Sequence, residues 1–422
     1  MILVAPRARL TAWRSDQTRL PREAWVLIGA NVVSALGYGV VSPVLPAFAR
    51  TFGVSMSSVT FAITMFSVMR LCCAPPSGML VQRLGERPVY LAGLLIGSVS
   101  TAACAFVQNY WELLVFRAIG GIGSTMFFIS ALGLMIRISP VDARGRVAGL
   151  FASSFLIGLV AGPLMGSLTA GLGLRAPFLI YGVVTLLTAV VVSYSLRGST
   201  LSAPGEKTHA EVTVRTALRN RAYRSALASN FATGWSVFGL RMAVVPLFIS
   251  DVLGRGPRVI GLTLALFAVG NVAVVLPSGY LSDRIGRRLL LIGGLLASGT
   301  ATIGLGASSS LTIFLVVACV AGAASGVFAS PQQAAIADIL GNAARAGTAV
   351  AAFQMMADLG AIVGAIVVAQ IAEHFGYGWG FTISGLIMFV AAVVWMFAPE
   401  TQCTQAVPAV EVRETGTASE PA

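Results

Sequence analysis

Charged residues are scarce in this sequence of 422 residues. Only 10% of the residues are Asp, Glu, Lys or Arg, whereas 56% are hydrophobic. A soluble domain carries about 25% charged residues, so this composition excludes an ordinary soluble fold. The chain instead has the composition of a protein whose outer surface meets lipid.

Residues that carry chemistry are also scarce. The sequence has two histidines, His209 and His374, and no HExxH, GxSxG or P-loop motif. The five cysteines are Cys72, Cys73, Cys104, Cys319 and Cys403. The first four lie in apolar segments and the last in a polar tail, which indicates neither disulfides nor a zinc site. We therefore expect no metal, no cofactor and no enzymatic activity.

The hydrophobic residues come in twelve runs of roughly 20–27 residues, each long enough to cross a ~30 Å hydrocarbon layer as a helix. The runs are 24–47, 56–80, 88–107, 110–136, 147–170, 175–196, 224–250, 257–281, 288–306, 310–340, 346–372 and 377–398. Hydrocarbon offers no partners to backbone N–H and C=O groups, so each run is predicted to be a helix. The 46 glycines agree with this prediction, because glycine permits close contact between helices in lipid.

The basic residues are distributed unevenly along the chain. The net charge of +12 is also typical of nucleic-acid-binding proteins. However, most of the 28 lysines and arginines lie in the N-terminal segment, in alternate loops and in the tail. The opposite loops hold only Arg50, Arg175, Arg255 and Arg258. This bias predicts a multi-pass protein of the plasma (inner) membrane with both termini cytoplasmic, and it argues against a nucleic-acid partner.

The two ends of the chain are predicted to be cytoplasmic segments. Residues 1–23 are not expected to be a cleavable signal, because MILVA is too short for its apolar core and five arginines follow. The alternative is that the sequence begins upstream of the true start. Residues 399–422 are predicted to be a disordered tail.

A short charged island occurs twice. Residues 78–87 read GMLVQRLGER and follow the second run, and residues 279–288 read GYLSDRIGRR and follow the eighth. A six-helix bundle at 24–196 and its duplicate at 224–398 explain the repetition. Internal repeats with a substrate site between them are typical of secondary transporters.

Residues 197–223 connect the two predicted bundles as a cytoplasmic linker. The first part of this linker is rich in Ser, Pro and Gly and is expected to be flexible. The second part, from about Val212, forms either a basic amphipathic helix on the inner leaflet or a solvated loop.

The second island matches G-x-L-x-D-R-x-G-R-R, the loop signature of the major facilitator superfamily, and residues 24–398 as a whole resemble this family. The first island departs from the signature at Gln82 and Glu86. The resemblance implies an all-α membrane protein with twelve transmembrane helices in two pseudo-symmetric six-helix bundles. We expect it to act as a monomer on a small-molecule substrate and protons within the lipid bilayer.

In this family the island aspartate is thought to latch the cytoplasmic side against a helix of the other half. By symmetry Asp283 should reach the start of the fifth span, near Arg144 and Arg146, because helix N-termini attract anions. Gln82 should face the start of the eleventh span near Arg345, but it brings no charge, so the predicted gate is asymmetric. The predicted gating residues are Gly78, Gln82, Arg83, Gly85, Gly279, Asp283, Arg284, Gly286, Arg287 and Arg288. The alternative is that these charges only fix the topology.

Two spans resemble further motifs of the family. The fifth follows the antiporter motif, which is associated with exporters that exchange substrate for protons, through Gly149, Gly158, Gly162, Pro163 and Gly166. Ser167 departs from the final glycine of that motif, and ordinary small-residue packing is the alternative. The fourth span, LLVFRAIGGIGS, resembles the motif whose arginine, here Arg117, is linked to proton movement. The alternative to a coupling role is that Arg117 reaches outward to the membrane surface. Glu112, five residues earlier, is a candidate to neutralise Arg117 loosely.

Asp358 is the one acid predicted to lie deep within a span. Arg70, Arg117 and Arg241 are also deep, and an arginine there is costly unless it faces a wet cavity or a partner. Burial disfavours a charged carboxylate and a nearby arginine favours it, so a change of access can load and unload a proton at Asp358. Arg70 or Arg241 is the expected partner. The alternative is a fixed ion pair that only holds helices together.

The first span, ALGYGVVSPVLPAF, resembles that of twelve-helix drug–proton antiporters, although Gly39 stands where several of them have an acid. Three deep arginines against one aspartate predict neutral, zwitterionic or anionic amphiphiles as substrates. The candidate residues for the cavity lining are Asn31, Tyr38, Phe127, Trp235, Asn271, Gln332 and Gln354, and ordinary packing is the alternative for each of them. The predicted function is proton-coupled efflux by alternating access, and the alternative is a proton-coupled symporter that takes up a small metabolite.

Overall fold

The computed structural model describes residues 22–54, 56–139, 144–170, 172–195, 213–255, 257–308, 310–341 and 346–402. Arg345 and the side chains of Tyr38, Pro163 and Gly166 lie outside the described part. The same holds for the expected N-terminal segment up to residue 21, for most of the linker and for residues 403–422.

The described residues form helices and contain no strand. The first half comprises α2 (Arg22–Arg50), α3 (Met56–Leu84), α4 (Glu86–Cys104), α5 (Tyr110–Ile138), α6 (Arg144–Ala170) and α7 (Ala176–Ser195). The second half comprises α8 (Val214–Ala217), α9 (Arg221–Thr233), η3 (Gly234–Val244), α10 (Val245–Asp251), α11 (Pro257–Ile285), α12 (Arg287–Gly306), α13 (Leu311–Leu340), α14 (Gly347–Phe375) and α15 (Tyr377–Met396). The π-helix η3 joins α9 to α10, so these three elements form one long helix.

Most of these helices are long and apolar enough to cross a membrane. Ten candidate spans are found among the described residues, and the long helices α3 and α6 are not among them. Arg70, Gln82 and Arg83 lower the hydropathy of α3, although it is 29 residues long. The prediction of an all-α membrane fold is confirmed, and α3 and α6 occupy the positions of the second and fifth predicted spans.

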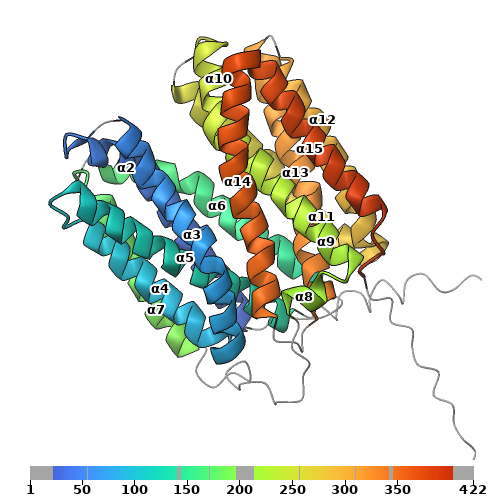
Figure 1. Ribbon diagram of the computed structural model, residues 1–422, viewed down its shortest axis with the longest axis horizontal. Coiled ribbons are helices and arrows are strands. Elements are labelled where there is room, and N and C mark those ends of the chain that lie inside the picture. Colours follow the sequence, from blue (N-terminus) through green and yellow to red (C-terminus); the bar gives the residue numbers. More distant parts are fainter. Residues whose placement is uncertain are drawn as a thin grey trace, which may run out of the picture.

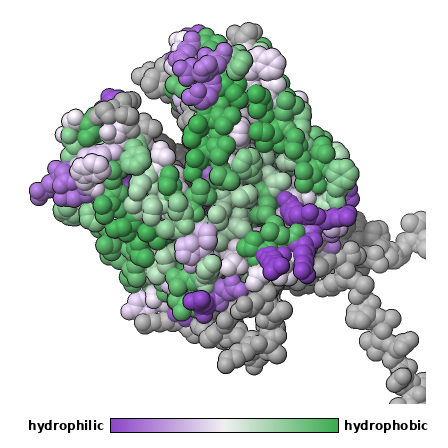
Figure 2. All heavy atoms as spheres, in the orientation of Figure 1, coloured by the Kyte–Doolittle hydropathy of each residue, from purple (hydrophilic) through white to green (hydrophobic). Residues whose placement is uncertain are grey.

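The helices are arranged as two bundles, α2 to α7 and α9 to α15 (Figure 1). Between the bundles, α6 packs against α11 and α13, and α3 packs against α14. The bundles meet at the end where α8 lies and diverge toward α10 (Figure 1). We refer to these as the closed end and the open end. Figure 2 shows the hollow at the open end and a hydrophobic middle on this face.

The apolar core explains why the bundles meet at only one end. At the closed end a single cluster of buried side chains spans both halves, from Tyr90 and Met135 to Leu340 and Phe353. Toward the open end the two halves have separate clusters, one around Phe48 and the other a larger set in the second bundle. Burial of apolar surface therefore holds the bundles together at the closed end and stabilises each bundle separately at the open end.

The structure describes the last part of the predicted linker, from residue 213, and the first part of the predicted tail, up to residue 402. Near the end of the linker, only the four-residue helix α8 precedes α9. The segment after α15 makes specific contacts where a disordered tail was expected. Glu400 accepts hydrogen bonds from the backbone N–H groups of Arg287 (2.8 Å) and Arg288 (3.0 Å), and therefore caps α12.

Candidate functional site

A cavity of about 340 Å³ lies between the two bundles. Its wall combines aromatic side chains, such as Phe127 and Phe267, with a polar set that includes Asn271 and Gln354. Residues from both halves contribute to the wall. A mostly apolar cavity with a few convergent polar groups is the usual form of a small-molecule site.

An ion pair crosses this cavity from one bundle to the other. Arg70 of α3 donates to Asp358 of α14, with Nη2 2.9 Å from Oδ1, and both side chains are largely buried. Arg70 also donates to Ser124 of α5 (3.2 Å) and lies over the ring of Phe128. Asp358 is the one acid among the described wall residues. The structure therefore selects Arg70 over Arg241 as the partner of Asp358.

Several acceptor oxygens of the cavity wall have no hydrogen-bond partner. They include Oδ1 of Asn271, Oε1 of Gln333 and Oδ2 of Asp358. All three residues belong to helices of the second bundle. Buried polar atoms are normally paired, because an unpaired one costs free energy. These oxygens are therefore available to N–H or O–H groups of a bound molecule.

The structure places four of the seven predicted lining residues on the wall, namely Phe127, Asn271, Gln332 and Gln354. Asn31 and Trp235 are not on it, which corrects that part of the prediction. Asn31 donates to the Phe151 carbonyl and to Ser154 of α6, and the Trp235 indole donates to Ser384 of α15. Both side chains therefore direct N–H groups to partners inside a bundle.

Two wall residues, Asn230 and Gln333, were not singled out from the sequence. For Asn230, the duplication of the chain contains a signal that could have identified it. Asn31 donates to the carbonyl of Phe151, and Asn230 donates in the same way to the carbonyl of Phe353 (2.5 Å). Asn230 is thus the equivalent of Asn31 in the second half, and it also accepts from Gln332 (2.7 Å). Nothing in the sequence distinguishes Gln333 from its neighbour.

The remaining charged residues assigned to proton coupling do not form one cluster. Arg117 is on the cavity wall and lies over Phe66, 4.5 Å from the ring centroid. Glu112 uses both carboxylate oxygens at the start of its own helix, accepting from the Gln108 backbone and the Asn109 side chain. Arg241 is buried against Phe267 and is not on the wall.

At the closed end, Asp283 binds the N-terminus of a helix in the other bundle. Its carboxylate accepts from the backbone N–H groups of Gly145 (2.9 Å) and Arg146 (3.1 Å) at the start of α6. Helix N-termini carry unpaired N–H groups and partial positive charge, which an anion stabilises. The resemblance of the island to the superfamily signature, together with the symmetry of the halves, implied this location, and the role in gating stays a prediction.

Asp338, which sequence reasoning missed, extends this contact. It pairs with Arg287 of its own bundle (3.1 Å) and with Arg144 of the other bundle (2.7 Å). Arg287 in turn pairs with Asp283 (2.5 Å). The result is a buried network of two acids and two arginines that joins α6 to α11, α12 and α13. Asp338 belongs to the last turn of its helix, where the sequence alone does not show which charge it meets.

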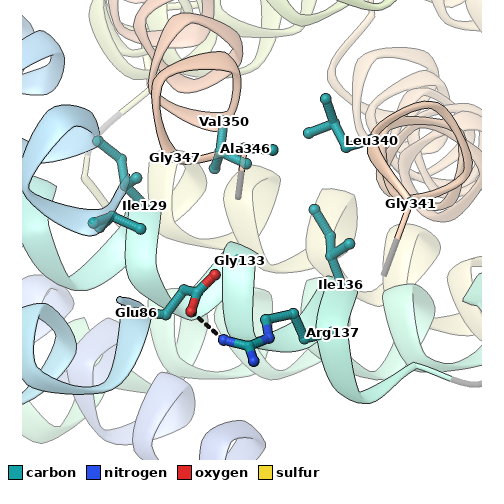
Figure 3. A pocket seen from close by; sticks show the side chains of 11 residues that line it. Glu86, Ile129, Gly133, Ile136, Arg137, Leu340, Gly341, Ala346, Gly347 and Val350 are labelled. Carbon is teal, nitrogen blue, oxygen red and sulfur yellow. Dashed lines mark hydrogen bonds and ion pairs between the residues drawn. The ribbon is translucent and has the colours of Figure 1, made fainter. Parts of the chain in front are cut away.

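The first half contains the same pair with its charges exchanged. Glu86 stands where the second island has Arg287, and it pairs with Arg137 of α5 (2.6 Å). Figure 3 shows Glu86 and Arg137 pointing toward each other beside Leu340 and Val350 of the other bundle. The cavity that these residues line is only about 10 Å³, which is close to the minimum for one water molecule. The two bundles therefore leave little free space at this point of the closed end.

Glycines permit the close approach of the two halves here. A Cβ atom on Gly279 would lie 2.5 Å from the Gly145 carbonyl oxygen, and one on Gly78 would lie 2.8 Å from that of Gly347. Gly85 and Gly286 end the turns of the two islands with φ of 86° and 100°. Such angles disfavour other residues. Gln82 lies beside Gly347 at the start of α14, while Arg83 and Arg284 are exposed.

The glycines of the fifth span lie at two interfaces. Cβ atoms on Gly158 and Gly162 would lie 2.4 Å from Ala35 and 2.5 Å from Gly39, so these residues let α6 approach α2. Gly149 instead faces Ser330 and Val275 of the other bundle. The small residues of α6 therefore serve packing within the first bundle and contact between the two bundles.

A sequence model of the Major Facilitator Superfamily matches residues 27–254 and again residues 226–415. The chain belongs to the Major Facilitator Superfamily. This is a family of membrane transporters, and the two matches agree with the duplicated architecture described above. Within the described residues, no group of His, Cys, Asp and Glu side chains is arranged to hold a metal ion.

Relatives in this superfamily include a tetracycline resistance protein and a multidrug efflux protein. The chain is 29% identical to the tetracycline resistance protein, class C, of Escherichia coli over 293 residues, which cover 64% of this chain and 70% of that protein. It is 24% identical to the multidrug efflux protein YfmO of Bacillus subtilis over 382 residues, which cover 89% and 92%.

Solved superfamily structures share the fold. The proton:xylose symporter XylE has a TM-score of 0.75 at 17% identity, over 90% of this chain and 96% of that one. A bacterial homologue of the iron transporter ferroportin, in its outward-facing state, has a TM-score of 0.75 at 14% identity, over 89% and 98%. At these identities the likeness concerns the fold alone.

Proposed function

We propose that this superfamily member exports small amphiphilic molecules in exchange for protons, by alternating access across the plasma (inner) membrane. The observation that carries the proposal is the Arg70–Asp358 pair, which joins the bundles inside the cavity. Asp358 has an unpaired Oδ2 beside this space, so it is positioned to exchange a proton with the cavity.

Protonation of Asp358 removes one half of the ion pair between α3 and α14. The Arg70 contact then loses most of its electrostatic attraction, and the two bundles are held less tightly at that point. In an antiporter, proton and substrate must exclude each other. A proton that enters from the outer side would neutralise Asp358 and weaken the polar contacts of the bound substrate, which then leaves outward. The proton leaves to the cytoplasm after the carrier turns inward.

Electrostatics support the predicted substrate class. The charged residues of the described cavity wall are Arg70, Arg117 and Asp358, so the wall favours neutral, zwitterionic or anionic molecules over cations. The named relatives include tetracycline resistance and multidrug efflux proteins. Tetracycline is a zwitterionic or anionic amphiphile near neutral pH, which makes it a suitable first probe.

The test is the Asp358→Asn variant in everted membrane vesicles. We expect it to abolish proton-driven tetracycline accumulation while it keeps tetracycline binding and counterflow exchange, because only the exchangeable proton is lost. Accumulation would be measured with an imposed pH gradient, at matched protein content. Gln354→Ala, one helical turn away, is the control for a change of cavity shape without loss of charge.

A fixed structural pair would behave differently. Removing one partner of a buried pair costs about 3–5 kcal/mol, so Asp358→Asn would then lower the unfolding temperature. The double variant Arg70→Gln, Asp358→Asn would restore stability, because no charge is left unpaired. Recovery of proton-driven transport in this double variant, or intact transport in Asp358→Asn, would refute the coupling role.

Uptake by proton symport is the second candidate, because the shared fold also includes the proton:xylose symporter XylE. Vesicle orientation distinguishes the two directions. An exporter concentrates its substrate in everted vesicles and a symporter in right-side-out vesicles, each under the physiological direction of the proton gradient.

A further inference from the structure

A cation without a counterion is buried in the second bundle. Arg241 is only 4% exposed, and its Nη1 has no hydrogen-bond partner. No carboxylate of the described part of the chain forms an ion pair with it. A buried charged side chain is costly, so an arginine kept inside a membrane helix normally marks a functional site.

The surroundings of Arg241 compensate its charge only in part. Its guanidinium lies over the ring of Phe267, with Cζ 3.3 Å from the ring centroid. The remaining surroundings include the apolar cluster of Leu240, Val244 and Phe248. An aromatic face attracts a cation through its quadrupole, but it does not replace the hydrogen bonds of a guanidinium.

Phe267 separates this cation from the cavity. Its side chain is part of the cavity wall, whereas Arg241 is not. Val237 and Phe238, about one turn before Arg241, are also on the wall, so Arg241 occupies the cavity-facing side of its helix. The Phe267 ring would have to move before the guanidinium could contact a molecule in the cavity.

The backbone at Arg241 has an unusual conformation. Arg241 lies in the π-helix Gly234–Val244, a rare form that is frequent at functional sites. Its turns are wider than those of an α-helix, and rewinding one turn would rotate the following side chains by about 100° around the axis. A Cβ atom on Gly234 would lie 2.0 Å from the carbonyl oxygen of Ala357, so this segment packs directly against the residue before Asp358.

We propose that Arg241 and Phe267 form a covered anion site, in which a carboxylate, sulfonate or phenolate of a cavity ligand displaces the ring and pairs with the guanidinium. The inference rests on the proposed transport function and narrows its substrate class to amphiphiles with an anionic group. The acceptor oxygens of Asn271 and Gln333 would bind hydrogen-bond donors of the same ligand.

The test compares two ligands of equal size on the purified full-length protein, 1-naphthoate and the uncharged 1-naphthylmethanol. Equilibrium binding would be measured by calorimetry. We expect Arg241→Gln to weaken naphthoate binding by about tenfold or more, because a charge-assisted contact is lost. Naphthylmethanol binding should change less than about twofold, since it has no charge to pair. Arg175→Gln, which removes an arginine that donates to the Val107 carbonyl, is the matched control.

Phe267→Leu provides a second, independent variant. It removes the cover and keeps an apolar side chain, so naphthoate binding should become stronger while naphthylmethanol binding does not. The proposal would be overturned if Arg241→Gln weakened the binding of both ligands equally. It would also be overturned if Phe267→Leu left naphthoate binding unchanged. Loss of naphthoate binding in Arg117→Gln but not in Arg241→Gln would also overturn the proposal, because Arg117 would then be the residue that binds the anion.

These binding measurements need no proton gradient, so they are separable from the transport test. Selective naphthoate binding through Arg241, without proton-driven export, would refute the proposed direction and coupling but support the anion site. Proton-driven export, together with an equal effect of Arg241→Gln on naphthoate and naphthylmethanol binding, would refute the anion site alone.

Discussion

At the scale of single residues, one of the differences between the two islands is at the equivalent positions Asp283 and Gln82. Asp283 satisfies two N–H groups at the start of α6 and also pairs with Arg287. Gln82 lies at the start of α14 and has no charge to complement a helix N-terminus. We therefore expect the two halves to contribute unequally to the stability of the closed end.

We predict that Asp283→Asn impairs transport much more than Gln82→Ala. The asparagine keeps the shape of the side chain but loses the charge that binds α6, which should weaken the closed end by about 1–2 kcal/mol. The check is the transport rate at matched surface expression, together with thiol labelling of a cysteine placed at the closed end. Equal impairment by the two variants would contradict the asymmetric gate.

At the scale of helices, the contact between α2 and α6 depends on the absence of side chains. Gly158 and Gly162 face α2 at distances that leave no room for a methyl group. A helix pair of this kind is held by backbone proximity and close packing rather than by large side chains. The glycine pattern thus has a structural role, and its association with export stays a prediction.

Gly162→Ala should destabilise the protein by about 1–3 kcal/mol, because the new methyl group forces α2 and α6 apart. Thermal unfolding of the purified protein measures this effect. Gly29→Ala is the matched control, since Gly29 lies in α2 with nothing within 4 Å of a Cβ atom. The control should be neutral or slightly stabilising, as alanine favours helices over glycine. Similar losses of stability in both variants would show that the close contact does not matter.

At the scale of the whole molecule, the charges of the closed end and the open end lead us to expect one orientation in the membrane. The closed end carries both islands and the basic residues Arg144, Arg146, Arg284 and Arg288. The positive-inside rule places such residues in the cytoplasm, so the hollow of Figure 2 would face outward. The structure would then represent the state in which the cavity exchanges protons and substrate with the outside.

We predict that residues 205 and 410 are cytoplasmic, and that Asn109 and Ser308 are external. Cysteines introduced singly at these four sites, in a background without reactive thiols, would be labelled in intact cells with a membrane-impermeant maleimide. Only the sites at 109 and 308 should react before the cells are permeabilised. Labelling at 205 in intact cells would contradict the topology.

Local sequence patterns were enough to predict much of the fold. Run length and composition indicated the helices, because hydrocarbon leaves a chain no other way to satisfy its backbone. The repeated island indicated the duplication, and its resemblance to the superfamily signature implied the place where Asp283 meets α6. The same patterns did not predict that Glu400 caps α12, because a single acid after the last helix carries no periodic signal.

The sequence by itself determined the class of protein, its two halves and the deep position of Asp358. Only the tertiary structure decided that Asp358 pairs with Arg70 while Arg241 lies behind Phe267, and that Asn230 rather than Asn31 is on the cavity wall. Hydropathy gives the depth of a residue in the membrane, which depends on its own helix. The direction in which a side chain points, and the partner that it meets, depend on the packing of helices far apart in the chain.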